Sequence, residues 1–202
     1  MVEIMADDVN ATAEPARLEA LARAAGGRDG LPPVHLWNPP HCGDIGLKIA
    51  RDGTWSCQGS PITRPALVQL FSTILRHDPD GHVLVTPVEK VAVEVEDAPF
   101  LAVSLRTDGE TLVFTTNVGD EVHAGADHPL RFETGPADGV KPYVLVRGDL
   151  WALLTRALVY DLAELAHMRV LDGRQQTGVS SQGQFFVMDK GGAPASATER
   201  NA

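Results

Sequence analysis

The stretch that decides the fold reads HVLVTPVEKVAVEVE and covers residues 82–96. Within it Val91, Val93 and Val95 occupy every second position, and two glutamates have the opposite parity. A period of two places the valines on one face of a β-strand and the acids on the other, so that one face is buried and the other is wet. Pro87 cannot donate the hydrogen bond that a central strand requires. The stretch therefore predicts half-buried strand structure with a break or an edge at Pro87.

Asp-Gly pairs divide the rest of the chain into short segments. Each pair predicts a turn, because glycine accepts a positive φ and aspartate tolerates one. Two of them lie inside predicted hairpins, in which residues 45–51 pair with 54–58 and residues 100–106 pair with 110–116. The six pairs begin at Asp29, Asp52, Asp80, Asp108, Asp138 and Asp172.

Three segments are expected to be helical. Residues 15–25 are rich in alanine, leucine and arginine and are followed by two glycines, which predicts an N-terminal helical arm. Residues 64–77 carry an apolar stripe at helical spacing, with Thr63 as the N-cap. Residues 149–167 repeat that pattern. The segment from Lys190 onward is rich in glycine, alanine and serine and is expected to be disordered.

The order of these elements suggests an internal duplication. In the first unit a hairpin over 45–58 is followed by the helix at 64–77 and a returning strand at 83–86. In the second unit strands ending at 143–147 are followed by the helix at 149–167 and a strand at 184–188. The evidence is the order and spacing of the elements, because residue-by-residue similarity is weak.

The formal net charge is −10, and the acidic residues are unevenly distributed. Residues 77–139 carry 13 acidic and 3 basic side chains, whereas residues 140–202 carry 6 acidic and 7 basic ones. A nucleic-acid polymer requires a basic face, so this balance argues against DNA or RNA as a partner. The acidic block is interpreted as a solvated strand surface. Alternatively, the flanking segments leave arginines available to an anionic ligand.

Composition also indicates the cellular compartment. No apolar run approaches the roughly 20 residues that a membrane helix needs, so no membrane span is expected. The N-terminus lacks the basic-then-apolar order of a secretory signal. Two cysteines, Cys42 and Cys57, fit a reducing environment better than a disulfide scaffold. We therefore expect a cytoplasmic protein.

Six short motifs follow one another along the chain. They are Trp37-Asn38-Pro39-Pro40-x-Cys42-Gly43, Arg51-Asp52-Gly53-Thr54-Trp55, Pro61-Ile62-x-Arg64, Thr86-Pro87-Val88-Glu89-Lys90, Glu96-Asp97-Ala98-Pro99-Phe100 and Thr116-Asn117-Val118-Gly119-Asp120. Taken together, this series resembles the bacterial domain-of-unknown-function 1285 family over roughly residues 31–190. The resemblance implies a two-part fold with internal duplication and a C-terminal half similar to pleckstrin-homology folds. It also implies a nucleotide-like ligand between the halves and a role in signal transduction.

The fold class predicted from these observations is α+β, with two abutting halves that each combine a sheet and a helix. The C-terminal half is expected to be a bent antiparallel sheet or barrel capped by a helix, as in pleckstrin-homology folds. The predicted division is an arm and linker at 1–33, a first domain at 34–88, a second domain at 89–189 and a tail at 190–202.

Arg64, Lys90 and Arg147 are the side chains expected to meet a small anionic, nucleotide-like ligand. Arg64 opens the second predicted helix, where unpaired amides and the positive end of the dipole attract an anion. A cation at that position is locally unfavourable, so it needs a role such as ligand binding or an ion pair with Asp97 or Glu89. Arg147 has a comparable place before the third predicted helix. We therefore predict that positive side chains from both halves face one cleft.

Trp37 and Asn38 are the candidates for contact with a ring. A rigid Trp-Asn-Pro-Pro turn can place the tryptophan in the core, and it can equally offer the indole for stacking on a base. Asn38 has both a donor and an acceptor for a base edge. Strand-end charges and turn side chains complete the predicted ligand-binding set, although such groups commonly pair internally. These are Glu89, Asp97, Thr116 and Asn117.

No enzyme motif occurs, so no catalytic residue, metal or cofactor is predicted. The chain lacks a phosphate-binding glycine loop, a dinucleotide fingerprint and a nucleophile elbow. Two alternatives to ligand binding stay open. One is a scaffold for protein interactions, whose partners the sequence does not identify. The other is a metal-assisted hydrolase that uses the 121–128 cluster, whose residue types suit a metal but whose spacing matches no recognised site. Its members are Glu121, His123, Asp127 and His128.

Overall fold

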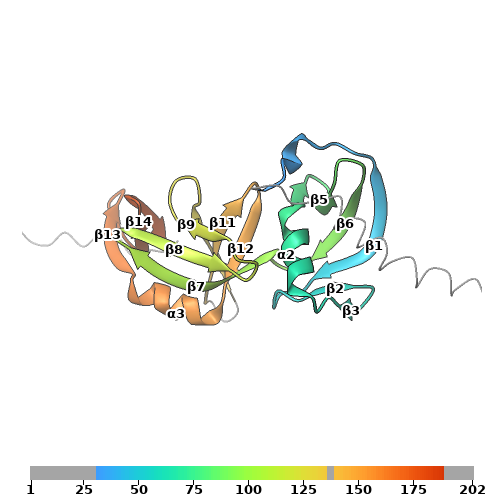
Figure 1. Ribbon diagram of the computed structural model, residues 1–202. Coiled ribbons are helices and arrows are strands. Elements are labelled where there is room, and N and C mark those ends of the chain that lie inside the picture. The colour runs from blue at the N-terminus through green and yellow to red at the C-terminus, as the bar shows by residue number, and fades with distance from the viewer. Residues whose placement is uncertain (1–30, 136–138, 189–202) are drawn as a thin grey trace, which may run out of the picture. The chain divides into compact units, whose positions relative to one another are not determined.

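The computed structural model describes residues 31–135 and 139–188 (Figure 1). The chain divides into two compact units, with the division between Asp97 and Ala98. This division lies beyond the predicted boundary at 88/89, because the strand that begins at Lys90 belongs to the sheet of the first unit. The predicted helix at 15–25 and the tail at 190–202 lie outside the described residues.

The first unit contains one six-stranded sheet, in the order β3-β2-β1-β6-β5-β4. The central strands β1 and β6 are parallel, and the other neighbours are antiparallel. The elements are η1 (Val34–Leu36), β1 (His41–Ile49), β2 (Trp55–Cys57), β3 (Ser60–Pro61), α2 (Pro65–Thr73), β4 (Leu75–Asp78), β5 (Gly81–Val85) and β6 (Lys90–Val95).

The second unit contains a six-stranded sheet in the order β10-β11-β12-β7-β8-β9 and a separate three-stranded sheet, β13-β14-β15. Its central strands β7 and β12 are again parallel, so this sheet is mixed and the prediction of an antiparallel sheet is wrong at its centre. The elements are β7 (Phe100–Asp108), β8 (Thr111–Thr116), β9 (Glu121–His123), β10 (Leu130–Thr134), β11 (Val140–Arg147), β12 (Leu150–Leu154), α3 (Arg156–Glu164), β13 (His167–Leu171), β14 (Arg174–Ser181) and β15 (Gln184–Val187).

The two six-stranded sheets have the same topology. In each, three strands run outward from the centre, and three more return to it, so that the first and sixth strands pair in parallel. The described residues therefore form a mostly β protein with two helices and two similar mixed sheets. The helices differ in their place: α2 lies between the third and fourth strands, and α3 follows the sixth. The predicted repeat was therefore misaligned, because it matched the strand at 184–188 to the first unit, and that strand belongs to the small sheet.

The aligned strands also reveal a repeated tetrapeptide. Residues 75–78 read Leu-Arg-His-Asp in β4, and residues 130–133 read Leu-Arg-Phe-Glu in β10. Each leucine pairs with the corresponding residue of the next strand, Leu84 or Val144. In each tetrapeptide the arginine Nε contacts the acid two positions later, at 2.6 Å in β4 and 3.2 Å in β10. The duplication therefore extends from topology to side chains.

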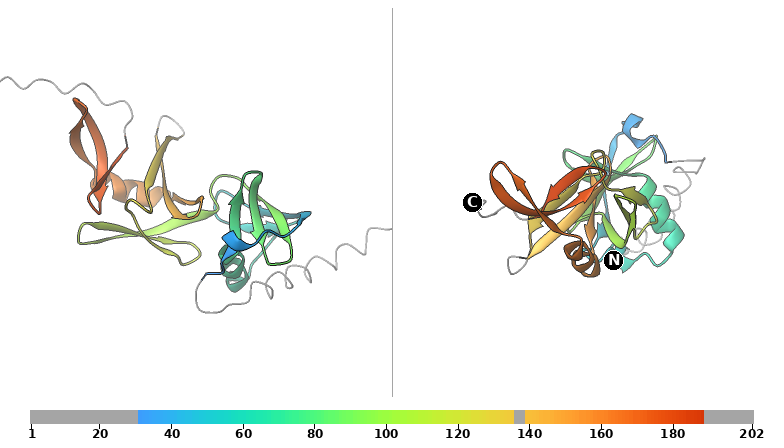
Figure 2. Two further views of the ribbon diagram at one scale, coloured as in Figure 1. Left: turned by 90° about the horizontal axis from the view of Figure 1, so that it is seen from above. Right: turned by 90° about the vertical axis from the view of Figure 1, so that its left-hand side faces the viewer.

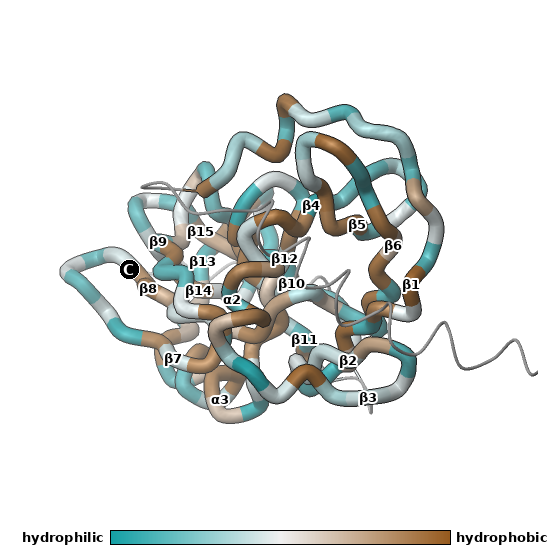
Figure 3. Tube along the Cα trace, turned by 45° about the vertical axis from the view of Figure 1, so that its right-hand side comes forward, coloured by the Kyte–Doolittle hydropathy of each residue, from teal (hydrophilic) through white to brown (hydrophobic). Residues whose placement is uncertain are grey.

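The strand predictions at 82–96 and in the two hairpins are confirmed. β5 and β6 flank Pro87, and Val91 and Val93 are buried. Hydrophobic residues dominate both strands (Figure 3). The predicted hairpins are β1–β2 and β7–β8.

The helix predicted at 64–77 begins one residue later than predicted, because Arg64 and not Thr63 is the N-cap, and the prediction is too long at its end. α2 begins with Pro65 at N1 and packs Phe71 against Trp55, with ring centroids 6.2 Å apart. It ends at Thr73, where the Ser72 and Thr73 hydroxyls donate to carbonyls three residues earlier, each at 2.7 Å. Such local bonds compete with the helical pattern, so the chain leaves the helix and enters β4.

The helix predicted at 149–167 is wrong over its first third. Leu150, Ala152 and Leu154 are buried in alternation, and β12 pairs with a strand on each side. An apolar run such as Leu-Trp-Ala-Leu-Leu fits either period, and tertiary pairing decides between them. The helix α3 begins only at Arg156, after Thr155 as N-cap. No helix in the described part of the chain is long and apolar enough to cross a membrane.

The small sheet depends on close contact between Phe185 and Gly178. A Cβ added at Gly178 would stand 2.8 Å from the Phe185 Cζ and would also collide with the Phe186 carbonyl. The ring lies beside His167 and Arg169, at 5.3 Å from the imidazole centroid and 5.2 Å from the guanidinium carbon. An aromatic ring that covers a strand glycine pins the register of the sheet.

Replacing Gly178 by Ala is expected to destabilise the second unit by about 1–3 kcal/mol, because the added methyl group overpacks this contact. Chemical denaturation measures the effect. Gln175→Ala, at an exposed site on the same strand, serves as the control and should change the free energy of unfolding by less than about 0.5 kcal/mol. Equal stability of the Gly178→Ala variant and the wild type would contradict the proposed packing.

Candidate functional site

The parallel central pair gathers predicted site residues at one edge of each sheet. In a parallel pair both strands begin at the same edge, so the segments that precede them lie together. In the first sheet His41 is in register with Lys90, and the Lys90 amide donates to the Pro40 carbonyl at 3.1 Å. This edge therefore brings the Trp37–Asn38 turn near Glu89 and Lys90.

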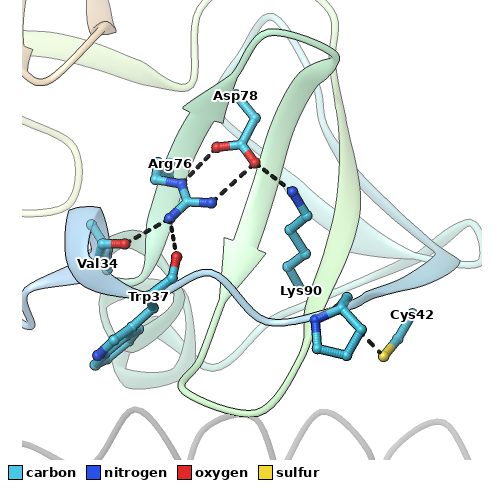
Figure 4. A network of polar contacts seen from close by, with 7 residues as sticks. Val34, Trp37, Cys42, Arg76, Asp78 and Lys90 are labelled. Carbon is cyan, nitrogen blue, oxygen red and sulfur yellow. Dashed lines mark hydrogen bonds and ion pairs between the residues drawn. The ribbon is translucent and has the colours of Figure 1, made fainter.

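Lys90 belongs to a charged network that ties this edge together (Figure 4). Its Nζ lies 2.8 Å from Asp78 Oδ2, and Asp78 also accepts two hydrogen bonds from Arg76, at 2.6 and 3.0 Å. Arg76 Nη1 donates to the carbonyls of Val34 and Trp37, at 2.7 and 2.6 Å. The network fastens the segment around η1 to β4, and Lys90 contributes to it through Asp78.

The Asp78 carboxylate is strongly stabilised in its charged form. The hydrogen bond from Arg76, with a further bond from Lys90, lowers its pKa from 3.8 to about 2. Its side chain is only 13% exposed, so solvent screens these contacts weakly. Asp78 was absent from the predicted set, although it determines what Lys90 does.

Other predicted residues of the first unit have varied surroundings. Trp37 is half-buried and Asn38 is exposed. Glu89 lies in a turn closed by Thr86, whose hydroxyl donates to the Glu89 carbonyl at 3.1 Å and accepts from the Glu89 amide at 3.2 Å. The Asp97 side chain is 5% exposed and lies 3.2 Å from Arg51 Nε.

Arg64 is the exposed N-cap residue of α2. Within residues 31–135 and 139–188 its guanidinium makes no ion pair. The alternative of an ion pair with Glu89 or Asp97 is therefore not observed in this part of the chain.

Thr116, Asn117 and Arg147 gather at the corresponding edge of the second sheet. The Thr116 hydroxyl accepts from the Asp120 amide at 2.9 Å, and Asn117 Oδ1 accepts from the Leu101 amide at 2.9 Å. Arg147 Nη1 donates to Asp120 Oδ2 at 2.7 Å, and its guanidinium lies over the Phe100 ring at 4.9 Å. All three side chains thus support local backbone or charge contacts.

The predicted ligand set is divided between the two units. Six of its members belong to the first unit and three to the second. Lys90 and Arg147 each form an ion pair with an acid of their own unit, and this leaves less positive charge for a ligand. The prediction that they share one site stays a prediction.

Members of the 121–128 cluster also contact residues outside it. His123 Nε2 lies 3.2 Å from Glu121, which also pairs with Arg106 at 3.0 Å. His128 Nδ1 lies 3.0 Å from the Leu145 carbonyl. Among the described residues there is no group of three or more His, Cys, Asp or Glu side chains that could hold a metal ion.

A pocket of about 290 Å³ lies in the second unit between the β7–β8 hairpin and strands β13 and β14. We name it the hairpin pocket. Figure 2 shows the small sheet that supplies one of its walls, in orange and red. The lining residues are Thr107, Gly109, Glu110, Leu112, Leu165, His167, Arg169, Ser180 and Gly183.

One wall of the hairpin pocket carries a serine–histidine pair. The Ser180 hydroxyl lies 3.1 Å from His167 Nε2, and His167 Nδ1 lies 3.5 Å from the Leu165 carbonyl. If Nδ1 carries the proton, Ser180 donates to Nε2. The imidazole is exposed and is oriented only by a long contact to a backbone carbonyl, so this arrangement is better suited to polar binding than to nucleophilic attack.

Two opposite charges complete the hairpin pocket. Arg169 and Glu110 are both exposed, and neither side chain forms an ion pair within the residues that the structure describes. The guanidinium of Arg169 stacks on Phe185 and is thereby held in place. An oriented guanidinium next to a hydroxyl and an imidazole can bind a carboxylate or a phosphate.

Sequence reasoning missed the hairpin pocket, although one signal was available. Asp172-Gly173 was identified as a turn and was not extended into a hairpin. In the structure Asp172 has a φ of 50° and Gly173 a φ of 73°, as a two-residue hairpin turn of type I′ requires. The turn joins β13 to β14 and places His167 opposite Gly178.

Comparison with known proteins identifies relatives of the whole described chain. Residues 32–98 match the N-terminal domain of "Domain of unknown function (DUF1285)", and residues 99–188 match the C-terminal domain of "Protein of unknown function (DUF1285)". A DUF1285 family protein from Silicibacter pomeroyi DSS-3 has a similar crystal structure, with a TM-score of 0.77 and 49% identity, over 85% of this chain and 93% of that chain.

A second DUF1285 family protein, from Shewanella baltica OS155, matches with a TM-score of 0.49 and 29% identity, over 59% of this chain and 91% of that chain. A search of curated protein sequences gave no match.

Replacing Asp78 by Asn is expected to lower the stability of the first unit by about 2 kcal/mol at pH 7, because the pKa of this carboxyl falls from 3.8 to about 2 on folding. A carboxyl with a lowered pKa contributes stability that is present above its unfolded pKa and is lost as the pH falls through its folded pKa. The difference between wild type and variant should therefore shrink between about pH 4 and pH 2, as measured by urea denaturation.

Asp80→Asn is the matched control, since Asp80 is an exposed acid in the adjacent turn. Its effect on stability should be small. A pH-independent effect of Asp78→Asn would show that the ionised carboxylate does not hold the network together.

Proposed function

Since the chain belongs to the DUF1285 family through both of its domains, we propose that it is a regulatory binding protein for a small anionic ligand held in the hairpin pocket. The observation that carries this proposal is Arg169. It lines a pocket beside the His167–Ser180 pair, is oriented by Phe185, and forms no ion pair among the described residues.

The lining defines the chemistry of the ligand. Arg169 binds an anionic group, His167 and Ser180 contribute polar contacts to it, and Glu110 accepts a hydrogen bond from a hydroxyl or amino group of the same molecule. A nucleotide-like molecule has both kinds of group. A volume of about 290 Å³ lies at the lower end of the range for ligand sites, which favours a mononucleotide or a smaller molecule over a dinucleotide.

The predicted site that combines Arg64, Lys90 and Arg147 is a competing location for the same ligand. Arg64 supports it, because this side chain is exposed at the start of α2 and makes no ion pair within the described residues. The ion pairs of Lys90 and Arg147 weigh against it. The family resemblance implies two further parts of this proposal. One is that the second domain is similar to pleckstrin-homology folds, and the other is that the protein has a role in signal transduction.

A thermal-shift titration of the full chain with nucleoside monophosphates and with inorganic phosphate tests the proposal. A ligand that binds only the folded state stabilises it by about 2.7 kcal/mol at 100 times its Kd. Arg169→Gln should reduce the affinity at least about tenfold, because it removes a charge-assisted hydrogen-bond donor. The matched control is Arg174→Gln, since Arg174 is an exposed arginine of the adjoining strand outside the pocket lining.

The Arg64→Ala variant separates the two locations. If it abolishes the shift while Arg169→Gln leaves the shift unchanged, the ligand binds at the first domain and the hairpin-pocket assignment is wrong. If neither phosphate nor any nucleotide raises the melting temperature of the wild type, small-anion binding itself is refuted.

A further inference from the structure

Strand β13 is an exposed sheet edge. It is the outermost strand of the three-stranded sheet, and within the described residues it pairs only with β14. Its first four residues are all exposed, with Met168 at 68% and Val170 at 61%. An open strand edge with large apolar side chains is a template for pairing with another chain.

Among the features that usually block strand addition, β13 carries a charge, on Arg169, but neither proline nor a bulge. Natural edges are protected by proline, by bulges or by charged side chains. Residues 167–171 contain no proline, and they pair with β14 from His167 to Leu171 without a register shift. The outer backbone groups of β13 are therefore presented in a regular row to a further strand.

The side chains of β13 define two chemically different faces. Met168 and Val170 point to one face, and His167 and Arg169 point to the other, because side chains alternate along a strand. An added strand that fits both faces carries apolar residues at every second position and acids between them. Arg169 makes no ion pair among the described residues, so its charge is available to such a partner.

Charge argues against a second copy of this chain as the occupant. Antiparallel pairing of two β13 strands about their middle residue would place Arg169 directly opposite its own copy. Like charges in directly opposite positions destabilise a strand pair. An acidic strand from another protein has the opposite effect.

We propose that β13 binds an extended peptide with alternating apolar and acidic side chains, which adds to the small sheet as a fourth strand. Its apolar side chains pack on Met168 and Val170, and its carboxylates meet His167 and Arg169. Backbone hydrogen bonds provide affinity and the side chains provide selectivity, as in other cases of strand addition. Because Arg169 also lines the hairpin pocket, a bound carboxylate and a small anion compete for it.

A dye-labelled peptide of alternating valine and glutamate, titrated with the full chain by fluorescence anisotropy, tests this proposal. Val170→Asp should weaken binding at least tenfold, because it puts a charge on the apolar face and repels the peptide. Val103→Asp is the matched control, since Val103 is an exposed valine of β7, and it should bind as the wild type does. A peptide of alternating valine and lysine should bind at least tenfold more weakly than the glutamate peptide.

Methylation of alternate backbone nitrogens separates strand addition from simple charge attraction. A peptide with the same side chains, but with methyl groups on the backbone nitrogens that would donate hydrogen bonds to β13, should no longer bind the protein. Equal binding of the methylated peptide, of the lysine peptide or by the Val170→Asp variant would overturn the proposal. If light scattering instead shows that the unliganded chain is a dimer and that the Val170→Asp variant is a monomer, the partner of β13 is a second copy of the chain, and the peptide proposal is wrong.

The two proposals fail separately in this design. The Val170→Asp variant keeps every residue that lines the hairpin pocket, so its thermal response to nucleotides should match that of the wild type. A retained nucleotide response with unchanged peptide binding overturns the strand-addition proposal alone. Loss of every anion response, with peptide binding still sensitive to Val170→Asp, overturns the proposed function alone.

Discussion

The parallel pairing of the first and last strands of each six-stranded sheet is the constraint on which the rest of the structure depends. A parallel pair cannot be closed by a tight turn, because the chain must return to the edge from which it started. In each six-stranded sheet the connection between the two central strands forms the rest of the sheet, with two strands beside the first central strand and two beside the last. One consequence is that the segments that precede the two central strands meet at one edge. Lys90 and the Trp37 turn meet in this way in the first sheet.

Several residues of the motifs that carry the family resemblance lie in the turns and strand ends that this pairing requires. Thr86 and Thr116 close the turns that follow β5 and β8. Asp97, at the end of the first unit, pairs with Arg51. Arg147 pairs with Asp120 where the second sheet has its corresponding edge. These motif residues therefore maintain turns and sheet edges, and the hairpin pocket is lined by other parts of the chain.

The repeated tetrapeptide shows how one pattern serves two surroundings. In β4 Arg76 turns its remaining donors to the carbonyls of the segment around η1 and locks that segment to the sheet. In β10 the matching Arg131 lies over Tyr143 and Trp151. The arginine–acid contact is common to both strands, and the neighbours decide what the free side of the guanidinium does. A duplicated sheet can thus diverge through the side chains that face it while its strand order stays unchanged.

The sequence by itself determined the local structure that depends on period and turn chemistry. The strands around Pro87 and the two Asp-Gly hairpins are examples, because a period of two and a positive φ are properties of adjacent residues. Tertiary structure alone decided that the apolar run from Leu150 forms a strand, since that run fits either period until its neighbours are in place. It also decided that Lys90 pairs with Asp78, and that His167 and Arg169 line one pocket with Glu110. These groupings join residues far apart in the chain, and no local pattern specifies which of several charges will come together.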